Sequence, residues 1–304
     1  MDDVDQAMIG LLSKDPRGSI KVMARQLQLS EATVASRIRS LQDRRVIKVV
    51  ARQRALGTNG YTVLSLVDIH VDDPRKIAEV SGALSAVGDV IAAYETARRP
   101  EIVAYLRARD LRHLGEIPEE IQRSVACLAQ MSLLPIMAMQ RRYKYIGSLE
   151  LPTPPAPLSR DLGARIVAAL ERDGRQPVRA LARELGVSDT AVRYRLGKLI
   201  KLAGFEIVTV CDAQAMGYAV RTDVRLRVSP PHLKATLIKL SANDSIISVS
   251  HIAGPYNVHA VVLSKTVDEF DDFINGTIRL LKGLDDFAIL RITRLHRYNY
   301  NIIM

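Results

Sequence analysis

Apolar residues recur at helical spacing in three short stretches at the start of the chain. The three stripes are Val4, Met8, Leu11 and Leu12, then Val22, Met23 and Leu27, and then Val34, Ile38 and Leu41. Leu29 and Ser30 form a short turn before the third stripe, and Ser30 stands at its N-cap position. Three amphipathic helices, the last two joined by a tight turn, predict a helix-turn-helix domain.

The same pattern returns in the second half of the chain. A shift of 158 residues aligns Asp15, Arg17, Ala24, Arg25, Leu27, Ser30, Val34, Arg37 and Leu41 with Asp173, Arg175, Ala182, Arg183, Leu185, Ser188, Val192, Arg195 and Leu199. An internal duplication is the economical explanation, so the chain consists of a copy one and a copy two. Residues 151–157 between the copies contain four prolines and are predicted to form an extended spacer.

Beyond each helix-turn-helix the apolar spacing changes from helical to alternating. In copy two, strands are predicted at 218–228, 246–252, 258–263 and about 287–295, with helices ending near Leu240 and covering about 267–281. Copy one gives the same order between residues 61 and 139. The order βαββαβ predicts a ferredoxin-like antiparallel sheet with two helices on one face.

The predicted fold class is therefore α+β, with two copies of a winged or three-helix helix-turn-helix domain plus a ferredoxin-like regulatory domain. The predicted domains are 1–55 (helix-turn-helix one), 56–148 (regulatory one), 149–158 (Pro-rich linker), 159–212 (helix-turn-helix two) and 213–304 (regulatory two).

Basic residues gather in the two helix-turn-helix segments. The chain carries a formal net charge of +10, and residues 14–54 hold eleven Lys or Arg against three Asp or Glu. Residues 159–209 hold ten against six. Basic charge placed at a predicted DNA-reading element favours double-stranded DNA as the partner.

The third helix of each copy is the predicted reading helix, because its outer face offers side chains to base edges and phosphates. The predicted DNA-binding residues are Ser30, Thr33, Ser36, Arg37, Arg39, Ser188, Thr190, Arg193, Tyr194, Arg195 and Lys198. The third helix of copy one is less cationic at its tip than that of copy two, but it is followed by Arg44, Arg45, Lys48, Arg52 and Arg54. Arg37 and Arg195 are equally suited to a phosphate and to an acidic residue of the first helix. The two unlike helices predict different sequence preferences.

The segment Leu185-Gly186-Val187-Ser188-Asp189-Thr190-Ala191-Val192, with Arg195 and Leu199, precedes a regulatory half that contains Ala253-Gly254-Pro255-Tyr256-Asn257. This arrangement resembles the Lrp/AsnC, or feast/famine, transcriptional regulators over nearly the whole chain, twice. The resemblance implies a regulator and not an enzyme, a homodimer paired through its regulatory sheets, and an amino acid or other metabolite bound as effector at their interface.

By the same resemblance, Gly254, Tyr256 and Asn257 are the expected effector-binding residues. Asn257 stands where the family usually has Asp, and the matching turn of copy one, residues 97–101, has no glycine. These departures argue against a free amino acid and against a site in copy one. Gly254 is equally well explained by a hairpin turn that needs a positive φ.

The sheets are expected to pair in at least a homodimer, because a ferredoxin-like layer leaves one face bare. A seven-residue spacer in extended conformation spans at most about 22 Å, which favours pairing between chains over pairing within one chain.

Two other functions share these features. Siroheme decarboxylases resemble the same plan, but they carry an Arg-rich segment and a nearby His after the third helix, and residues 46–54 and 205–211 contain no His. An architectural protein that binds the DNA backbone with little sequence preference is the third class, favoured by the basic charge but not by two unlike reading helices.

The remaining residues suggest no metal site and no cofactor. The six histidines lack metal-ligand spacing, and Cys127 and Cys211 lie in apolar surroundings typical of buried, reduced thiols. The start of the chain lacks a basic leader, and no apolar run reaches the length of a membrane span. A cytoplasmic protein is therefore expected.

Overall fold

The computed structural model describes residues 1–54, 60–124, 128–141, 145–147, 161–202, 205–298 and 302–303. The chain divides into two compact units: 1–59, 143–216 and 299–304 in one, 60–142 and 217–298 in the other. We call them the helical unit and the barrel unit and describe each separately. The predicted spacer and Cys127 lie outside the described residues, whereas Cys211 is a buried free thiol.

Copy one begins the helical unit with α1 (Asp3–Lys14), α2 (Ile20–Leu27) and α3 (Glu31–Asp43). Asp2 caps α1 by accepting a hydrogen bond from the Asp5 amide at 2.8 Å, and the Ser30 hydroxyl caps α3 by accepting from the Thr33 amide at 3.0 Å. The predicted stripes form the core, in which Met8, Leu12, Val34, Ile38 and Leu41 are buried. The predicted three-helix domain is therefore confirmed.

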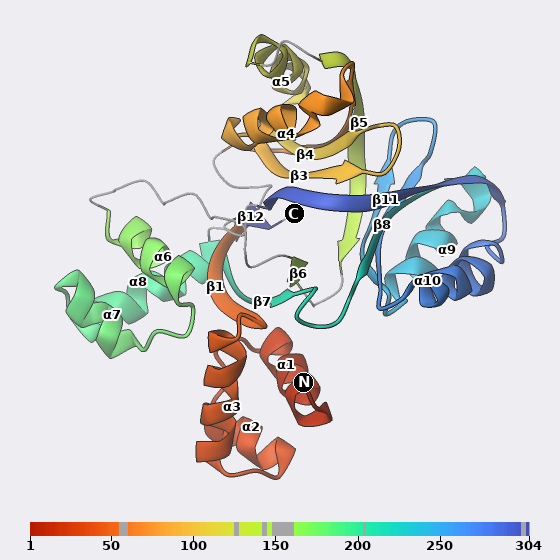
Figure 1. Cartoon of the computed structure of the whole chain (residues 1–304). Coiled ribbons are helices and arrows are strands. Elements are labelled where there is room, and N and C mark those ends of the chain that lie inside the picture. The colour runs from red at the N-terminus through yellow and green to blue at the C-terminus, as the bar shows by residue number, and fades with distance from the viewer. Residues whose placement is uncertain are drawn as a thin grey trace. The chain divides into compact units, whose positions relative to one another are not determined.

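Copy two repeats this domain with α6 (Leu162–Arg172), α7 (Val178–Leu185) and α8 (Asp189–Leu202). Asp161 caps α6 through the Ala164 amide. Gly186 ends α7 with a φ of +67°, a conformation that glycine adopts without strain, and the helix-turn-helix turn follows it. In Figure 1 the two helical groups lie at the strands β1 and β7.

A small sheet joins the two helix-turn-helix domains. β1 (Ile47–Arg54) pairs antiparallel with β7 (Phe205–Asp212), with β12 (Ile302–Ile303) beside β1 and β6 (Tyr145–Gly147) beside β7. Each strand packs on the other copy's helices: Ala51 lies in the core of α6–α8, and the Thr209 hydroxyl donates to the Leu12 carbonyl at 2.6 Å. The basic segment after α3 is thus largely a structural strand, in which Arg52 is fully buried.

Two arginines connect the domains by reciprocal contacts. Arg17 donates to the carbonyls of Gly174 and Gln176, both at 3.1 Å. Its counterpart Arg175 donates to the carbonyls of Pro16 and Gly18 at 2.6 and 3.0 Å. Because equivalent residues make equivalent contacts, the two copies are related here by an approximate two-fold axis.

In the barrel unit each copy contributes four strands and two main helices. Copy one consists of β2 (Val63–Val71), the short η1 (Pro74–Lys76), α4 (Ile77–Ala86), β3 (Val90–Thr96), β4 (Ile102–Ala108), α5 (Leu111–Ser124) and β5 (Leu128–Arg141). Copy two consists of β8 (Val220–Val228), α9 (Pro230–Ser241), β9 (Ile246–Ile252), β10 (Val258–Ser264), α10 (Val267–Phe273), η2 (Ile274–Ile278) and β11 (Leu284–Tyr298). The predicted βαββαβ order is present in both. None of the described helices is long and apolar enough to cross a membrane.

The two sheets close into one barrel with the strand order β10-β8-β11-β3-β4-β2-β5-β9. Closure uses two antiparallel seams between the copies, β3 with β11 and β5 with β9. The expectation of pairing between chains, with sheet faces as partners, is therefore wrong for this structure. The copies pair edge to edge within one chain, because joining the outer strands satisfies their backbone hydrogen bonds and encloses the bare sheet faces together.

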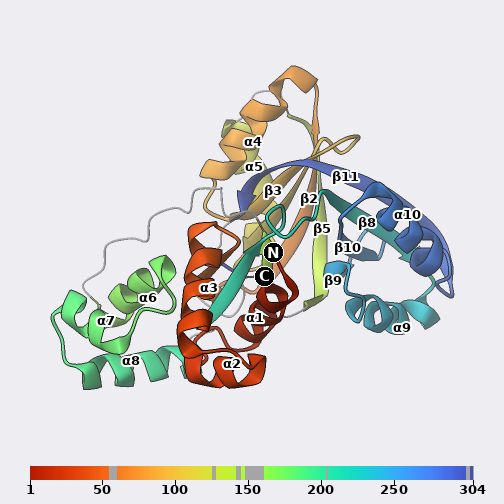
Figure 2. The ribbon, with the colours of Figure 1, turned by 60° about the horizontal axis from the view of Figure 1, so that its bottom comes forward.

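Helices cover the outside of the barrel, α4 and α5 on copy one and α9 and α10 on copy two (Figures 1 and 2). One face of each strand packs on these helices: Val67 and Ile69 belong to the core of copy one, and Val224 and Leu226 to that of copy two. The alternate residues point into the barrel. On β8 they include Asp223 and Arg225, which are buried, so this strand places charged residues on the enclosed face.

Candidate functional sites

The predicted reading helices present the expected side chains to solvent. On α3, Val34 and Ile38 are buried, whereas Thr33, Ser36 and Arg39 are exposed. The same division holds on α8, where Val192 and Leu196 are buried. Its exposed residues are Thr190, Arg193, Tyr194 and Lys198.

Tyr194 marks the outer face of α8 most clearly. Its side chain is 64% exposed, and the Lys198 ammonium lies 4.7 Å from the centre of its ring. A large exposed aromatic ring next to a cation suits contact with a charged, partly apolar surface such as the wall of a DNA groove. The α3 face carries one arginine and small polar residues in the same place, so the two faces differ in chemistry as the sequence predicted.

Ser30 and Ser188 serve first as helix caps. The Ser188 hydroxyl accepts a hydrogen bond from the Ala191 amide at 3.2 Å, as Ser30 does from Thr33. Both side chains are also exposed. A cap at the start of a reading helix places its hydroxyl at the end of the helix that favours anions.

Arg37 and Arg195 both pair with acidic residues at the start of the first helix of their domain. Arg37 bonds Asp2 and Asp5 at 2.7 and 2.8 Å, and Arg195 bonds Asp161 at 2.8 Å. Hydrogen bonds from the Asp5 backbone and then from Arg37 lower the pKa of Asp2, and those from Ala164 and then Arg195 lower the pKa of Asp161. Each arginine therefore ties its reading helix to the cap of the domain's first helix and acts as a positioning residue, while its contact with DNA stays a prediction.

We expect one carboxylate of the helical unit to make stability depend on pH. Burial raises the pKa of Glu171 on α6 to about 7, and nearby Lys48 on β1 opposes the shift. A raised pKa means that the folded state holds the proton more tightly, so this contribution is fully present below about pH 4.5 and is lost as pH rises from there through about 7. Thermal unfolding at pH 5.5 and 8.0 should show a smaller fall for Glu171→Gln than for wild type. Equal falls would contradict this account.

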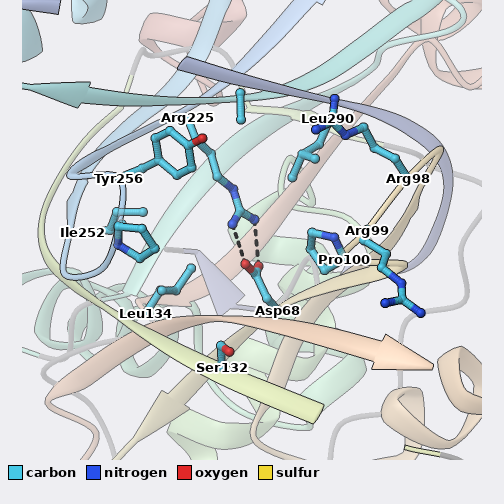
Figure 3. A pocket seen from close by; sticks show the side chains of 12 residues that line it. Asp68, Arg98, Arg99, Pro100, Ser132, Leu134, Arg225, Ile252, Tyr256 and Leu290 are labelled. Atoms are coloured by element: carbon cyan, nitrogen blue, oxygen red, sulfur yellow. Dashed lines mark hydrogen bonds and ion pairs between the residues drawn. The ribbon is translucent and has the colours of Figure 1, made fainter. Parts of the chain in front are cut away.

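The barrel unit contains a cavity of about 280 Å³ (Figure 3). Strands of both copies and the turns after β3 and β9 enclose it. Its lining residues are Asp68, Arg98, Arg99, Pro100, Ser132, Leu134, Arg225, Ile252, Pro255, Tyr256, Ala288 and Leu290. Equivalent positions line it in pairs, among them Asp68 with Arg225, so the cavity lies on the approximate two-fold axis of the barrel.

Two of the three predicted effector residues do not line this cavity. The Asn257 side chain accepts from the Val228 amide at 2.9 Å and donates to the Val228 carbonyl at 2.7 Å, which assigns it a structural contact. Gly254 has a φ of +148°, and a Cβ there would lie 2.7 Å from Leu134. It therefore fits the hairpin explanation. Tyr256 alone lines the cavity, and its hydroxyl donates to Asp286 at 3.2 Å.

Sequence reasoning missed the pair at the centre of the cavity. The Arg225 guanidinium bonds both carboxylate oxygens of Asp68, and Arg225 and Asp68 are both largely buried. The signal was present in the alignment of the copies, where opposite charges occupy one strand position. An acid and a base at equivalent positions of a duplicated sheet indicate contact only once the sheets are known to face each other.

Comparison with known proteins places the chain in a family. A model of the AsnC-type helix-turn-helix domain matches residues 1–42 and 161–200, which hold α1–α3 and most of α6–α8. An uncharacterised HTH-type transcriptional regulator of Pyrococcus horikoshii is 30% identical over 166 residues, covering 49% of this chain and 95% of that protein. The chain belongs to the Lrp/AsnC family. The HTH-type transcriptional regulator FL11 of Pyrococcus furiosus is 22% identical over 135 residues, and the match spans 43% of this Lrp/AsnC chain and 89% of FL11.

A solved structure resembles both halves of this Lrp/AsnC chain at once. The siroheme decarboxylase NirDL matches 97% of this chain and 93% of its own with a TM-score of 0.65, at 18% sequence identity. At this identity the likeness concerns the fold. It shows that the tandem arrangement of two helix-turn-helix domains and two regulatory domains occurs in another solved protein.

Proposed function

We propose that this Lrp/AsnC chain is a sequence-specific DNA-binding regulator of transcription that reads DNA through α3 and α8. The observation that carries the proposal is the exposed face of α8, with Arg193, Tyr194 and Lys198, on an AsnC-type helix-turn-helix domain. A second reading helix with a different face, on α3, supports unlike half-sites in one operator.

The exposed side chains divide by the kind of contact they suit. Arginine donates two parallel hydrogen bonds to guanine, so Arg193 on α8 and Arg39 on α3 suit base recognition. Lys198 suits a phosphate as a point charge, and Thr33, Ser36 and Thr190 suit either kind of contact. Arg37 and Arg195 contribute by holding the reading helices in place.

The experiment that tests DNA recognition compares binding to selected and to random DNA at two salt concentrations. A specific reader keeps a large preference for its own site as salt rises, because base contacts add to the phosphate contacts. If both affinities fall together and remain equal, the chain binds the DNA backbone only, and the architectural alternative holds.

We further propose that the cavity of the barrel unit binds the effector. Arg98 is the lining cation for which no acidic partner is recorded among the described residues, because Arg99 pairs with Glu101 and Arg225 with Asp68. A small metabolite with an acidic group therefore suits this cavity. Its volume is at the small end of ligand pockets.

We expect one effector per chain, because the cavity lies on the approximate axis and each chain has one barrel. A thermal-shift screen of amino acids and small carboxylic acids would find the ligand, and calorimetry would count the sites. Arg98→Ala should weaken binding, whereas the matched exposed change Arg75→Ala should not. Two sites per chain would contradict the proposal.

A homodimer of chains stays a prediction with less support than the sequence suggested. Its reason was a bare sheet face, and the barrel encloses both faces within one chain. Light scattering on the purified protein measures this directly, with 33.7 kDa as the mass of one chain.

The full-length fold likeness to a siroheme decarboxylase keeps one enzymatic alternative in view. Visible absorption spectra of the protein mixed with siroheme would test it. A shifted siroheme spectrum, followed by loss of carboxyl groups as carbon dioxide from the tetrapyrrole, would favour the enzyme over the regulator.

A further inference from the structure

Asp68 and Arg225 occupy the same position in the two copies. A shift of 157 residues places β2 (Val63–Val71) on β8 (Val220–Val228), and the same shift places Asp68 on Arg225. In the barrel order three strands separate β2 from β8 on either side, so the two strands lie opposite each other. One position of the duplicated sheet therefore carries an anion in copy one and a cation in copy two.

The two side chains meet inside the barrel in a bidentate ion pair (Figure 3). The distances from Arg225 to the two Asp68 oxygens are 2.5 Å from Nη1 and 2.8 Å from Nη2. The Arg225 side chain is 5% exposed and that of Asp68 14%. Charge-assisted pairs in this geometry are strong and directional, and water screens them little at this depth.

The seams of the barrel show that the axis between the copies is close to a true two-fold axis. Tyr94 pairs with Leu295 across one seam, and His251 pairs with Ala138 across the other. A shift of 157 converts each of these pairs into the other. In a barrel made of two copy-one sheets, Asp68 would therefore face a second Asp68.

Such a like pair would lack a cation. Among the described residues, Arg225 alone is recorded as bonding the Asp68 carboxylate, and it belongs to copy two. Two largely buried carboxylates facing each other repel, and one would have to take up a proton. The copy-one surface therefore requires a partner that brings a guanidinium.

A barrel of two copy-two sheets would be less unfavourable, because Arg225 also pairs with Asp223 of the same strand at 3.1 Å. Barrels made of two equal copies are nevertheless disfavoured overall. Each chain supplies one copy of each kind, so every pair of two copy-two sheets would leave two copy-one sheets to pair with each other.

We propose that Asp68 and Arg225 are a recognition pair through which a copy-one sheet accepts only a copy-two sheet as its barrel partner. Every barrel is then linked to one helix-turn-helix domain with α3 and one with α8, whether the strands come from one chain or two. The ion pair at the centre of the barrel thus ensures that each assembly contains two different reading helices. This inference does not depend on the ligand of the cavity or on DNA binding.

Charge reversals in the full chain test the pair. Asp68→Arg and Arg225→Asp should each lower the unfolding midpoint by at least about 5 °C, because each places like charges together inside the barrel. The double variant Asp68→Arg/Arg225→Asp restores opposite charges across the barrel and should have a higher midpoint than Arg225→Asp, with which it shares the second acid beside Asp223. Asp72→Arg, at an exposed position beyond the end of β2, is the matched control and should leave the midpoint unchanged.

Co-expression tests the choice of partner. Chains with Asp68→Arg and chains with Arg225→Asp, carrying different tags, have complementary charges only between chains. They should co-purify more than two differently tagged wild-type chains do. If either reversal fails to fold alone, the neutral change Asp68→Asn takes its place and should lower the midpoint below that of the wild type, whereas Asp72→Arg should not. A double variant no more stable than Arg225→Asp, or co-purification at the wild-type level, would overturn the proposal.

Discussion

Replacing Asp223 by alanine is expected to destabilise the barrel unit by about 3–5 kcal/mol, because it breaks a buried ion pair. Asp223 is fully buried and accepts hydrogen bonds from Arg225 and, at 2.9 Å, from the Tyr94 hydroxyl. Burial alone would raise its pKa, but His259 and Arg225 hold the pKa below its ordinary value. Without this carboxylate, Arg225 keeps Asp68, but the buried His259 loses its acidic neighbour.

Denaturant unfolding followed by circular dichroism and tyrosine fluorescence measures this loss, since the chain has no tryptophan. Glu116→Ala is the matched control, because Glu116 pairs with Arg112 on helix α5 of the same unit at 3.2 Å, and both side chains are exposed. Removing that surface pair should cost about 0–1 kcal/mol. A loss below 1 kcal/mol for Asp223→Ala would show that the buried network does not hold the barrel together.

The second large effect is expected on DNA. Arg193→Ala or Tyr194→Ala should weaken binding to the operator by about 1–3 kcal/mol, or roughly 5- to 150-fold, if the residue contacts a base. Lys198→Ala should weaken binding to operator and random DNA alike, because a phosphate contact carries no sequence information. All three side chains are exposed, so these changes should leave the unfolding transition in place.

Gel-shift titrations against operator and random fragments would separate the two kinds of contact. Lys282→Ala, an exposed lysine of the barrel unit, is the control for the loss of one positive charge. Operator affinity that survives both Arg193→Ala and Tyr194→Ala would mean that α8 does not enter the groove.

Local patterns predicted local structure well. The apolar stripes and the cap Ser30 mark helices that depend on neighbouring residues alone, and both βαββαβ orders follow from alternation and turn residues. The reading faces of α3 and α8 were predicted for the same reason, since helical spacing decides which residues point away from the core.

Contacts between the copies were not predictable in this way. The sequence predicts that basic residues, Arg52 among them, follow α3, but Arg52 is buried because β1 pairs with β7 of the other copy. The length of the spacer favours pairing between chains. The barrel instead closes within one chain at the edges of the two sheets, and the spacer alone does not set how far apart those edges lie. Three further side chains make contacts inside the chain that spacing along the sequence does not predict: Arg37, Arg195 and Asn257.

Selection of binding sites from random DNA tests the central claim most directly. The full chain should enrich one motif with two unlike half-sites, one for α3 and one for α8. Arg193→Ala together with Tyr194→Ala should erase one half-site and leave the other. Failure of the chain to enrich any sequence, or enrichment of two identical half-sites that the double change leaves intact, would contradict the account.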